Sequence, residues 1–153
     1  KEASELASLC KKFNALFIIN DRVDIAIASN ADGVHLGEDD IPPKLAREIL
    51  GEDMLIGTTT HSLKHPIAIE SDYIGLGPIY QSNTKPNLKA SGLNYIIEAS
   101  KKLETPWFAI GGINESNVNE VISAGAKKIA VVDAIMGSKN PSSATSNLLK
   151  NIQ

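Results

Sequence analysis

Short apolar runs alternate with amphipathic stretches along the whole chain, and polar residues follow each run directly. Each run spans about four residues and is partly β-branched. Such runs are typical of strands that are covered on both faces of a parallel sheet. The pattern predicts strands at residues 16–19, 33–36, 54–57, 73–76, 107–110 and 129–132.

The stretches between these runs place apolar residues at helical spacing. Pro42-Pro43 favours a helix start and Gly51 favours its end. Asn114 or Ser116 is suited to cap a later helix that ends at Ala124-Gly125. The helices are expected at residues 1–13, 23–29, 43–50, 93–99, 116–124, 134–136 and 143–152.

This alternation predicts an α/β protein with parallel strands joined by crossover helices. Two architectures fit six such units: an open doubly wound sheet, or part of a TIM (β/α)8 barrel. A complete barrel typically needs about 250 residues, with about 200 as a lower bound. The chain has 153 residues, and no linker or low-complexity tract divides it. We therefore expect a single domain over residues 1–153 and, if it is a barrel, an incomplete one.

Composition narrows the function classes. The chain is 42% hydrophobic, which allows a real core, and its net charge of -3 argues against a general nucleic-acid binder. No apolar run is long enough to span a bilayer, so no membrane partner is expected. The single Cys10 cannot form an intrachain disulfide, which favours a reduced, cytoplasmic location.

Polar clusters follow the predicted strands where each strand ends. The carboxyl ends of parallel strands meet on one rim, where active sites of such folds gather. Carboxylates, hydroxyls, backbone amides and one lysine suit a phosphate substrate held through Mg²⁺, which takes one or two carboxylates together with substrate phosphates. The clusters are Asn20-Asp21, Glu38-Asp39-Asp40, Thr58-Thr59-Thr60-His61, Ser82–Lys85, Gly111-Gly112 and Val132-Asp133.

The segment Asp72–Lys85 carries the clearest of these signals. An apolar strand breaks at Gly77-Pro78 and continues into a loop that presents two hydroxyls and one ammonium group. These groups can hold an anion at the end of the strand. The alternative is a solvated loop with an ordinary surface lysine.

Each of the other candidates also has a structural explanation. Asp21 could pair with Arg22 instead of binding a metal, and Asp40 could cap the helix that follows it. Gly111-Gly112 could admit a phosphate to the backbone amides, or could only form a tight turn. His35 stands between two apolar residues, where a packed, hydrogen-bonded histidine is the more probable role.

Five segments together resemble the thiamine-phosphate synthase family, within the wider superfamily that includes TenI-like proteins. They occur in that family's order and at its spacing, and the resemblance runs from residue 1 to the final helix. The segments are Phe17–Val23, Ala31–Asp40, Ile56–Ser62, Tyr73–Lys85 and Ala109–Ile113.

The resemblance implies a transferase of thiamine biosynthesis on a TIM-barrel fold. Members join 4-amino-2-methyl-5-pyrimidinylmethyl diphosphate to a thiazole phosphate, which yields thiamine phosphate and pyrophosphate. Lys85 would be the catalytic residue that stabilises the departing charge. By the same resemblance, Asn20, Thr59 and Lys85 would contact the pyrimidine diphosphate, Asp21 and Asp40 would hold Mg²⁺, and Ser82, Thr84, Gly112, Val132 and Asp133 would hold the thiazole phosphate.

Three departures from the family pattern bear on activity. The family's first two strands are absent, so we expect exposed sheet edges and possible homo-oligomers. Asp133 stands where the family usually has serine; an aspartate there could cap the following helix and would repel phosphate. Ser82 replaces the usual threonine and keeps the hydroxyl.

Two alternatives to a synthase stay open. One is the related thiazole tautomerase, which lacks the diphosphate chemistry and more often carries histidine near position 78. Gly77-Pro78 and Thr84-Lys85, together with Asn20-Asp21 and Asp40, favour the synthase. The other alternative is a non-catalytic homologue that binds a phosphorylated ligand, which Asp133 favours.

Overall fold

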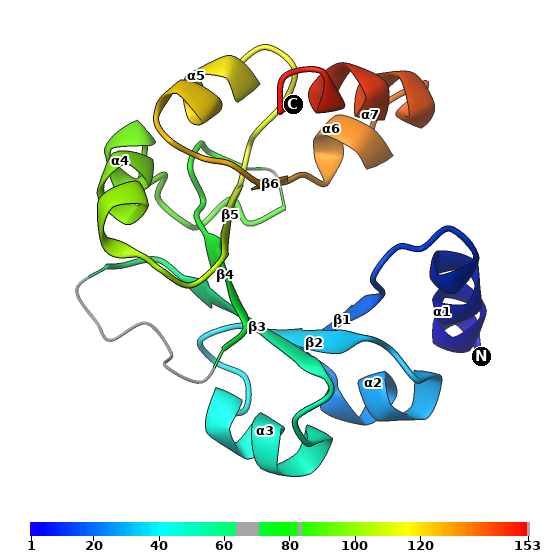
Figure 1. Cartoon of the computed structure of the whole chain (residues 1–153). Helices are drawn as coiled ribbons and strands as arrows, with labels where there is room; N and C mark the ends of the chain where they lie inside the picture. Colours follow the sequence, from blue (N-terminus) through cyan, green and yellow to red (C-terminus); the bar gives the residue numbers. More distant parts are fainter. Residues whose placement is uncertain (64–70, 83, 153) are drawn as a thin grey trace. The chain divides into compact units, whose positions relative to one another are not determined.

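Strands and helices alternate along the chain as the sequence predicts (Figure 1). The structure is a computed structural model that describes residues 1–63, 71–82 and 84–152. Its elements are α1 (Glu2–Lys12), β1 (Ile18–Asn20), α2 (Val23–Ser29), β2 (Gly33–Leu36), α3 (Pro43–Leu50), β3 (Leu55–Thr60), β4 (Tyr73–Leu76), α4 (Leu93–Lys102), β5 (Trp107–Ile110), α5 (Val118–Ser123), β6 (Ile129–Ala130), α6 (Asp133–Met136) and α7 (Pro141–Leu149).

The six strands follow one another in the sheet in their sequence order, β1-β2-β3-β4-β5-β6. The pairs β1–β2, β2–β3 and β5–β6 are parallel. A doubly wound sheet reverses its strand order at a switch point, whereas a β/α barrel adds each strand beside the one before it. The sequential order therefore confirms the barrel type of fold with six β/α units and excludes the doubly wound alternative.

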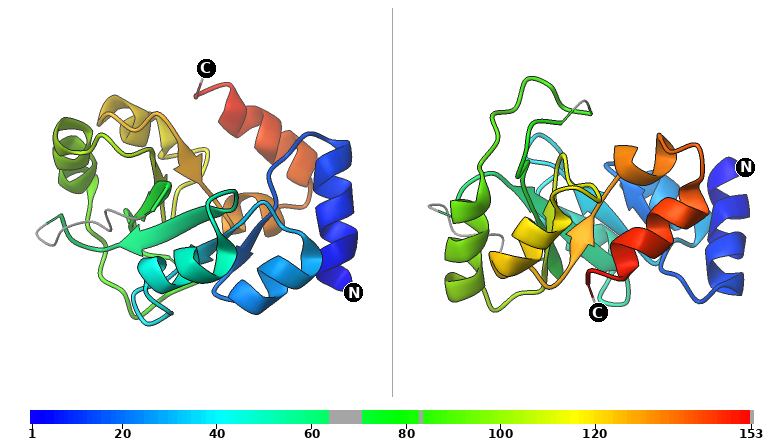
Figure 2. Two further views of the ribbon diagram at one scale, coloured as in Figure 1. Left: turned by 60° about the horizontal axis from the view of Figure 1, so that its bottom comes forward. Right: turned by 90° about the horizontal axis from the view of Figure 1, so that it is seen from above.

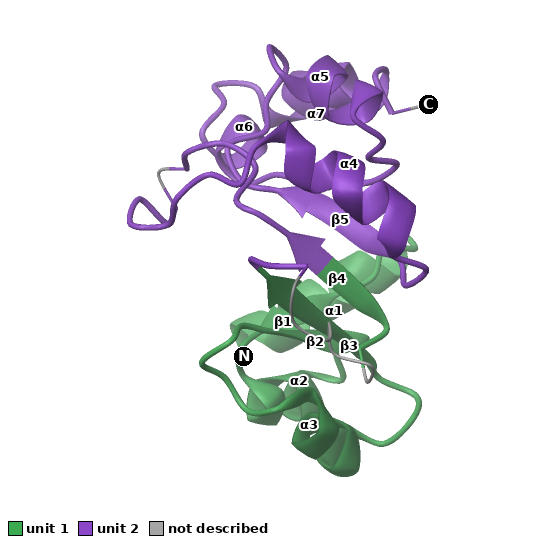
Figure 3. Cartoon of the chain, turned by 90° about the vertical axis from the view of Figure 1, so that its left-hand side faces the viewer, with its two compact units in different colours: residues 1–60, 64–74 green, residues 61–63, 75–153 purple. Residues whose placement is uncertain are grey.

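The chain divides into two compact units, which Figure 3 shows in different colours. Of the described residues, the first unit contains 1–60 and 71–74, and the second contains 61–63, 75–82 and 84–152. Each unit has its own apolar core.

In the first unit, α2 and α3 cover one face of the strands β1–β3 (Figure 1). Val34, Leu36 and Ile56 are fully or almost fully buried on that face, against Ala26 of α2 and Ala46 of α3. Side chains alternate between the two faces of a strand. The alternation places three polar side chains on the opposite face, namely Asn20 of β1, His35 of β2 and Thr59 of β3.

In the second unit, α4 lies beside α5, and α6 lies beside α7 (Figure 2). Ile96 of α4 and Val121 of α5 are completely buried, and Leu148 of α7 is 3% exposed. They pack with Ile79 and Ala109 in one core. The strand β5 and the loop after β4 are thereby fixed to the helices of this unit.

Several element boundaries differ from the sequence-based expectation; β6, for example, ends at Ala130 instead of Val132. β1 begins at Ile18 instead of Leu16, whose side chain is 68% exposed. β3 continues through Thr60 because β-branched threonines suit a strand as well as apolar residues do. α5 begins at Val118, and neither Asn114 nor Ser116 caps it, so that prediction is wrong.

Arg47 of α3 joins three backbone segments of the first unit. Its guanidinium donates to the carbonyls of Gly51 and Met54, at 2.9 and 2.7 Å, and to Oδ2 of Asp72 at 2.6 Å. The same Asp72 oxygen accepts from the amide of Ile56 at 2.7 Å. The end of α3, the start of β3 and the residue before β4 therefore share one hydrogen-bonding centre.

We expect Arg47→Ala to lower the free energy of unfolding by about 2 kcal/mol, because bonds to a charged, half-buried guanidinium contribute more than neutral ones. Arg47→Lys should recover part of this loss, since one ammonium cannot reproduce the planar fork. Urea denaturation would measure both variants. The control is Lys44→Ala on the exposed side of α3, and an equal effect of the two alanine variants would contradict the role given to Arg47.

Candidate active site

The candidate residues of the first unit lie at the carboxyl ends of β1, β2 and β3. Asn20 is the last residue of β1 and pairs with His35 in the register of the sheet. Asp21 follows at once, with a positive φ of 64°, and its amide donates to the carbonyl of His35 at 2.8 Å. Thr59 lies near the end of β3. The structure thus brings Asn20, Asp21 and Thr59 to one edge of the first unit.

Arg22, the residue after Asp21, forms an ion pair with Asp24. The guanidinium of Arg22 binds the Asp24 carboxylate with nitrogen–oxygen distances of 2.6 and 2.8 Å, and this pair lowers the pKa of Asp24 and raises that of Arg22. Asp21 is exposed at the strand end. The metal-ligand role and the ion-pair alternative for Asp21 both stay predictions.

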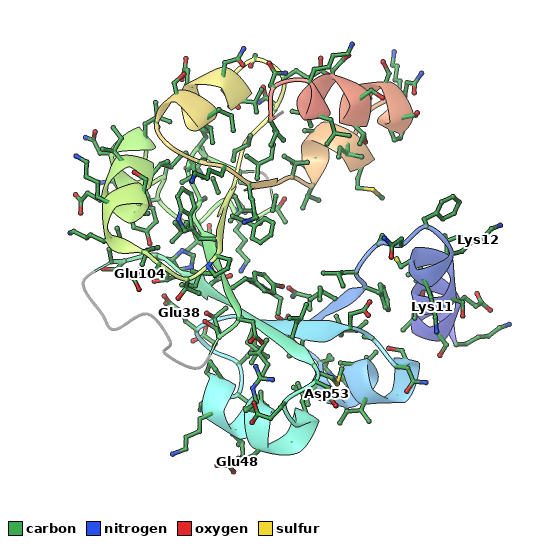
Figure 4. All side chains as sticks on the ribbon, viewed as in Figure 1. Lys11, Lys12, Glu38, Glu48, Asp53 and Glu104 are labelled. Carbon is green, nitrogen blue, oxygen red and sulfur yellow. The ribbon has the colours of Figure 1, made fainter. Side chains whose placement is uncertain are left out.

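Asp40 closes the turn that follows β2. Its Oδ2 accepts a hydrogen bond from the amide of Gly37 at 2.6 Å. α3 begins three residues later at Pro43 and has no side-chain cap, so Asp40 does not cap that helix. Asp40 is half-buried, whereas Glu38 (labelled in Figure 4) and Asp39 in the same turn are exposed.

Asp21 and Asp40 are suitable ligands for Mg²⁺ by their chemistry. Both are carboxylates that follow adjacent parallel strands, β1 and β2. Mg²⁺ prefers oxygen ligands and is usually held by one or two carboxylates with substrate phosphates and water. Across residues 1–63, 71–82 and 84–152, no group of three or more His, Cys, Asp or Glu side chains is arranged as a metal site. Two aspartates with a phosphorylated substrate are the donor set that these strand ends offer.

Thr59 belongs to a network that the sequence does not reveal. Its Oγ1 lies 2.8 Å from Nε2 of His35, and Nδ1 of the same ring lies 3.1 Å from the hydroxyl of Tyr73. Burial raises the pKa of Tyr73 to about 12. The expectation that His35 is packed and hydrogen-bonded is confirmed, and its two partners are new.

The raised pKa of Tyr73 predicts a loss of stability at high pH. Between the ordinary tyrosine value near 10 and the native value of about 12, the unfolded chain releases a proton that the folded chain keeps. Stability from this group is complete below pH 10 and falls as pH rises through that window. The loss should stay below about 2 kcal/mol, because the hydroxyl is partly open to solvent.

Alkaline titration of phenolate absorbance tests this prediction. Tyr73→Phe should remove the latest step of the titration, while Tyr80→Phe should leave that step in place. A wild-type titration that is complete well before the pH reaches the native value given for Tyr73 would contradict the assigned environment.

The candidate residues of the second unit surround the loop after β4. The side-chain amide of Gln81 donates to the carbonyl of Pro86 at 2.7 Å, which fixes the base of the loop. The Ser82 oxygen accepts from the amide of Thr84 at 3.3 Å and keeps its own hydrogen to donate. Thr84 and Lys85 are exposed. The loop therefore presents two hydroxyls and one ammonium group, as expected, while Asn83 lies outside the described residues.

The Gly111-Gly112 turn after β5 packs against the same loop. Both glycines have positive φ, 100° and 66°. A Cβ on Gly111 would lie 2.5 Å from Cα of Pro78, and one on Gly112 would lie 2.6 Å from the carbonyl oxygen of Gln81. Only glycine fits either position. The structure thus brings the Gly112 backbone next to the loop that carries Ser82 and Thr84.

Two asparagines hold this turn in place. The side-chain amides of Asn114 and Asn117 donate to the carbonyl of Gly112, at 3.3 and 3.0 Å. The side-chain oxygen of Asn117 also accepts a hydrogen bond from the backbone amide of Asn114 at 2.9 Å. The sequence suggested Asn114 as a helix cap, but the structure gives both asparagines a role in fixing the Gly112 peptide.

Val132 and Asp133 form the remaining turn, after β6. Val132 is 48% exposed, and Asp133 is the first residue of α6. The four-residue helix has no side-chain cap, so the expectation that Asp133 caps it is wrong. The carboxylate of Asp133 is exposed at this end of the second unit.

The fold and the placement of polar residues define a class of protein: a β/α-barrel type whose candidate site lies at the carboxyl ends of its strands. The family model described as thiamine monophosphate synthase matches residues 1–135. This chain belongs to the thiamine monophosphate synthase family, as the sequence motifs indicated.

Relatives support this membership. The chain is 51% identical over 152 residues to the thiamine-phosphate synthase of Prochlorococcus marinus, covering 97% of this chain and 43% of the relative. It is 50% identical over 153 residues to that of Thermosynechococcus vestitus, covering 98% of this chain and 44% of the relative. The chain therefore spans less than half the length of these curated relatives.

A solved structure gives the same result for the fold. The thiamine phosphate pyrophosphorylase from Pyrococcus furiosus superposes with a TM-score of 0.89 at 35% sequence identity. The match covers 98% of this chain and 73% of that chain.

Among the helices of the described residues, none is long and apolar enough to cross a membrane.

Proposed function

We propose that this chain acts in thiamine biosynthesis as a thiamine-phosphate synthase, coupling 4-amino-2-methyl-5-pyrimidinylmethyl diphosphate to a thiazole phosphate. The observation that carries the proposal is the identity of about half of all residues with synthases over nearly the whole chain. The candidate residues at the strand ends support it. The substrates are small phosphorylated molecules, and the lone free Cys10 is compatible with the cytoplasm.

The chemistry asks for charge stabilisation and positioning. The bond between the pyrimidinyl methylene carbon and the diphosphate oxygen breaks, and the diphosphate leaves with the electron pair. The lone pair of the thiazole nitrogen then forms the new bond to that carbon, so no protein nucleophile is needed. Asp21 and Asp40 would hold Mg²⁺, which when bound supplies positive charge to the diphosphate. The ammonium of Lys85 would stabilise the same departing charge.

The other residues would orient the two substrates. Asn20 and Thr59 would donate hydrogen bonds to the diphosphate from the strand ends of the first unit. Ser82, Thr84 and the Gly112 amide would hold the thiazole phosphate in the second unit, beside the turn at Val132. Fixed donors of this kind align reacting groups and hold charge without reorganisation.

Isothermal titration calorimetry tests the proposal. We expect heat of binding from the thiazole phosphate, and from the pyrimidine diphosphate only when Mg²⁺ is present. With both substrates and Mg²⁺, release of pyrophosphate should follow. Absence of heat from either substrate would overturn the proposal, and binding without product would support the non-catalytic homologue instead. Isomerisation of the thiazole without diphosphate chemistry would support the tautomerase.

The aspartate at position 133 favours the alternative that this chain is a non-catalytic homologue. A carboxylate and a phosphate about 4 Å apart repel each other by roughly 1 kcal/mol in water and about 4 kcal/mol at an effective dielectric constant near 20. We expect Asp133→Ser to bind the thiazole phosphate about tenfold more tightly, as measured by calorimetry. An unchanged affinity would show that this carboxylate does not face the phosphate.

A further inference from the structure

The His35 ring joins two hydroxyls on the face of the first unit that points away from α2 and α3. Nδ1 lies 3.1 Å from the Tyr73 hydroxyl, and Nε2 lies 2.8 Å from Oγ1 of Thr59. The His35 and Tyr73 rings are tilted by 32°, with their centroids 5.5 Å apart. Three neighbouring strands, β2, β3 and β4, thus contribute one residue each to a single chain of hydrogen bonds.

Gly57 makes room for this arrangement. A Cβ at this position would overlap the phenol ring of Tyr73, so the ring lies across the backbone of β3. Gly57 pairs with His35 in the register of β2 and β3. The missing side chain lets Tyr73 reach across one strand to the histidine on the next.

The hydrogen bonds have two possible directions. A phenol is more acidic than an alcohol and so is the stronger donor to a neutral imidazole. With Tyr73 donating to Nδ1, the proton of the ring must be on Nε2, where it donates to Oγ1 of Thr59. The Tyr73 hydroxyl keeps its proton at neutral pH, because burial raises its pKa to about 12.

This direction determines what Thr59 can do. The hydroxyl has one hydrogen to donate, and His35 is the one partner that the described part of the chain gives its oxygen. When His35 donates, the Thr59 hydrogen stays available for an acceptor outside the network. In the reverse direction, Thr59 would give that hydrogen to Nε2 and could not donate it to a ligand.

We propose that His35, oriented by Tyr73, is a positioning residue that holds the Thr59 hydroxyl as a hydrogen-bond donor to the diphosphate of the substrate. The inference rests on the proposed function, because Thr59 is there assigned to the diphosphate. It adds two residues, His35 and Tyr73, that act through Thr59.

NMR of the imidazole nitrogens tests the direction without any ligand. The expected result is a proton on Nε2 with Nδ1 as the acceptor, and Tyr73→Phe should weaken this preference. Tyr80→Phe, which removes a phenol hydroxyl that donates to Glu120, is the matched control and should change nothing. A proton on Nδ1 would overturn the inference whatever the chain binds.

Calorimetry with inorganic pyrophosphate and Mg²⁺ tests the consequence for binding. Thr59→Val and His35→Leu should each weaken binding about tenfold, and His35→Gln should recover part of the loss because its amide can replace Nε2–H. In the Thr59→Val background, His35→Leu should have no further effect. Thr58→Val makes the same chemical change on the opposite face of β3, where Thr58 binds Ser71, and should bind as the wild type does.

The outcomes separate the inference from the proposed function. If the wild type binds pyrophosphate but the losses from His35→Leu and Thr59→Val add up independently, His35 does not act through Thr59 and the inference is wrong. If the wild type fails to bind, the proposed function fails, and the assignment of Thr59 as a donor to the diphosphate is overturned with it. The NMR result then still decides the direction of the hydrogen bonds.

Discussion

Asp40→Asn is expected to weaken the Mg²⁺-dependent binding of the pyrimidine diphosphate about a hundredfold, or about 2.7 kcal/mol. The substitution removes one of two carboxylates available to the metal ion, and an amide is a poor ligand for a hard divalent cation. It keeps an oxygen that can accept from the Gly37 amide, so the turn after β2 should persist. The measurement is a calorimetric titration with and without Mg²⁺.

Asp39→Asn is the matched control. It removes the same charge from the residue just before Asp40 in the same turn. The Asp39 side chain is exposed and takes no part in the hydrogen bond between Gly37 and Asp40. We expect less than a twofold change from this variant, because an exposed charge is screened by water and salt. If both variants weaken binding equally, Asp40 acts only through the negative electrostatic potential of the turn and is not a metal ligand. Unchanged thermal stability of both would show that the fold is intact.

The fold was largely predictable because each β/α unit is marked locally. The apolar runs at Gly33–Leu36, Tyr73–Leu76 and Trp107–Ile110 coincide with β2, β4 and β5. Short, partly β-branched apolar runs bounded by turn residues are typical of strands in a parallel sheet. The α3 helix was marked at both ends, by Pro43 and by Gly51. The strand order was not marked in this way, because right-handed crossovers occur in doubly wound sheets as well as in barrels, and the sequential order is seen only in the structure.

Local signals failed where a distant group competes for the same side chain. Asn114 has the chemistry of a helix cap, but the carbonyl of Gly112 offers it a partner and α5 begins later. Asp133 likewise could have been a cap, but it is the first residue of the four-residue helix α6, which has no side-chain cap. Capping preferences describe an isolated helix end, and the tertiary structure overrides them here.

The candidate site was predictable in its residues but not in its hydrogen bonds. Strand ends pointed to Asp21, Asp40 and Thr59 because parallel strands deliver their carboxyl ends to one edge. The partners of His35 are 24 and 38 residues away, and only the register of three strands brings them together. One signal was present in the sequence: Gly57, next to bulky neighbours in a strand, indicates close approach of another group.

The second large effect is expected for Gly112→Ala, which should weaken binding of the thiazole phosphate at least tenfold. Alanine would have to adopt the positive φ of 66°, and its Cβ would lie 2.6 Å from the Gln81 carbonyl oxygen and 2.8 Å from Cβ of Tyr80. Neither atom is the end of a flexible chain, so the turn and the loop after β4 must move apart. The Gly112 amide would then leave the loop that carries Ser82. Unfolding should also become easier by about 2 kcal/mol.

Gly92→Ala separates the two causes in this prediction. Gly92 has a similar positive φ of 73°, but no atom lies within 4 Å of its Cβ position, so the variant carries backbone strain without a clash. We expect it to lose stability and to retain its affinity for the thiazole phosphate. Calorimetry at a temperature where both variants remain folded makes the comparison. Equal affinities of the two variants would show that the contact between the Gly112 turn and the loop after β4 does not shape the phosphate site, because strain alone would then account for both.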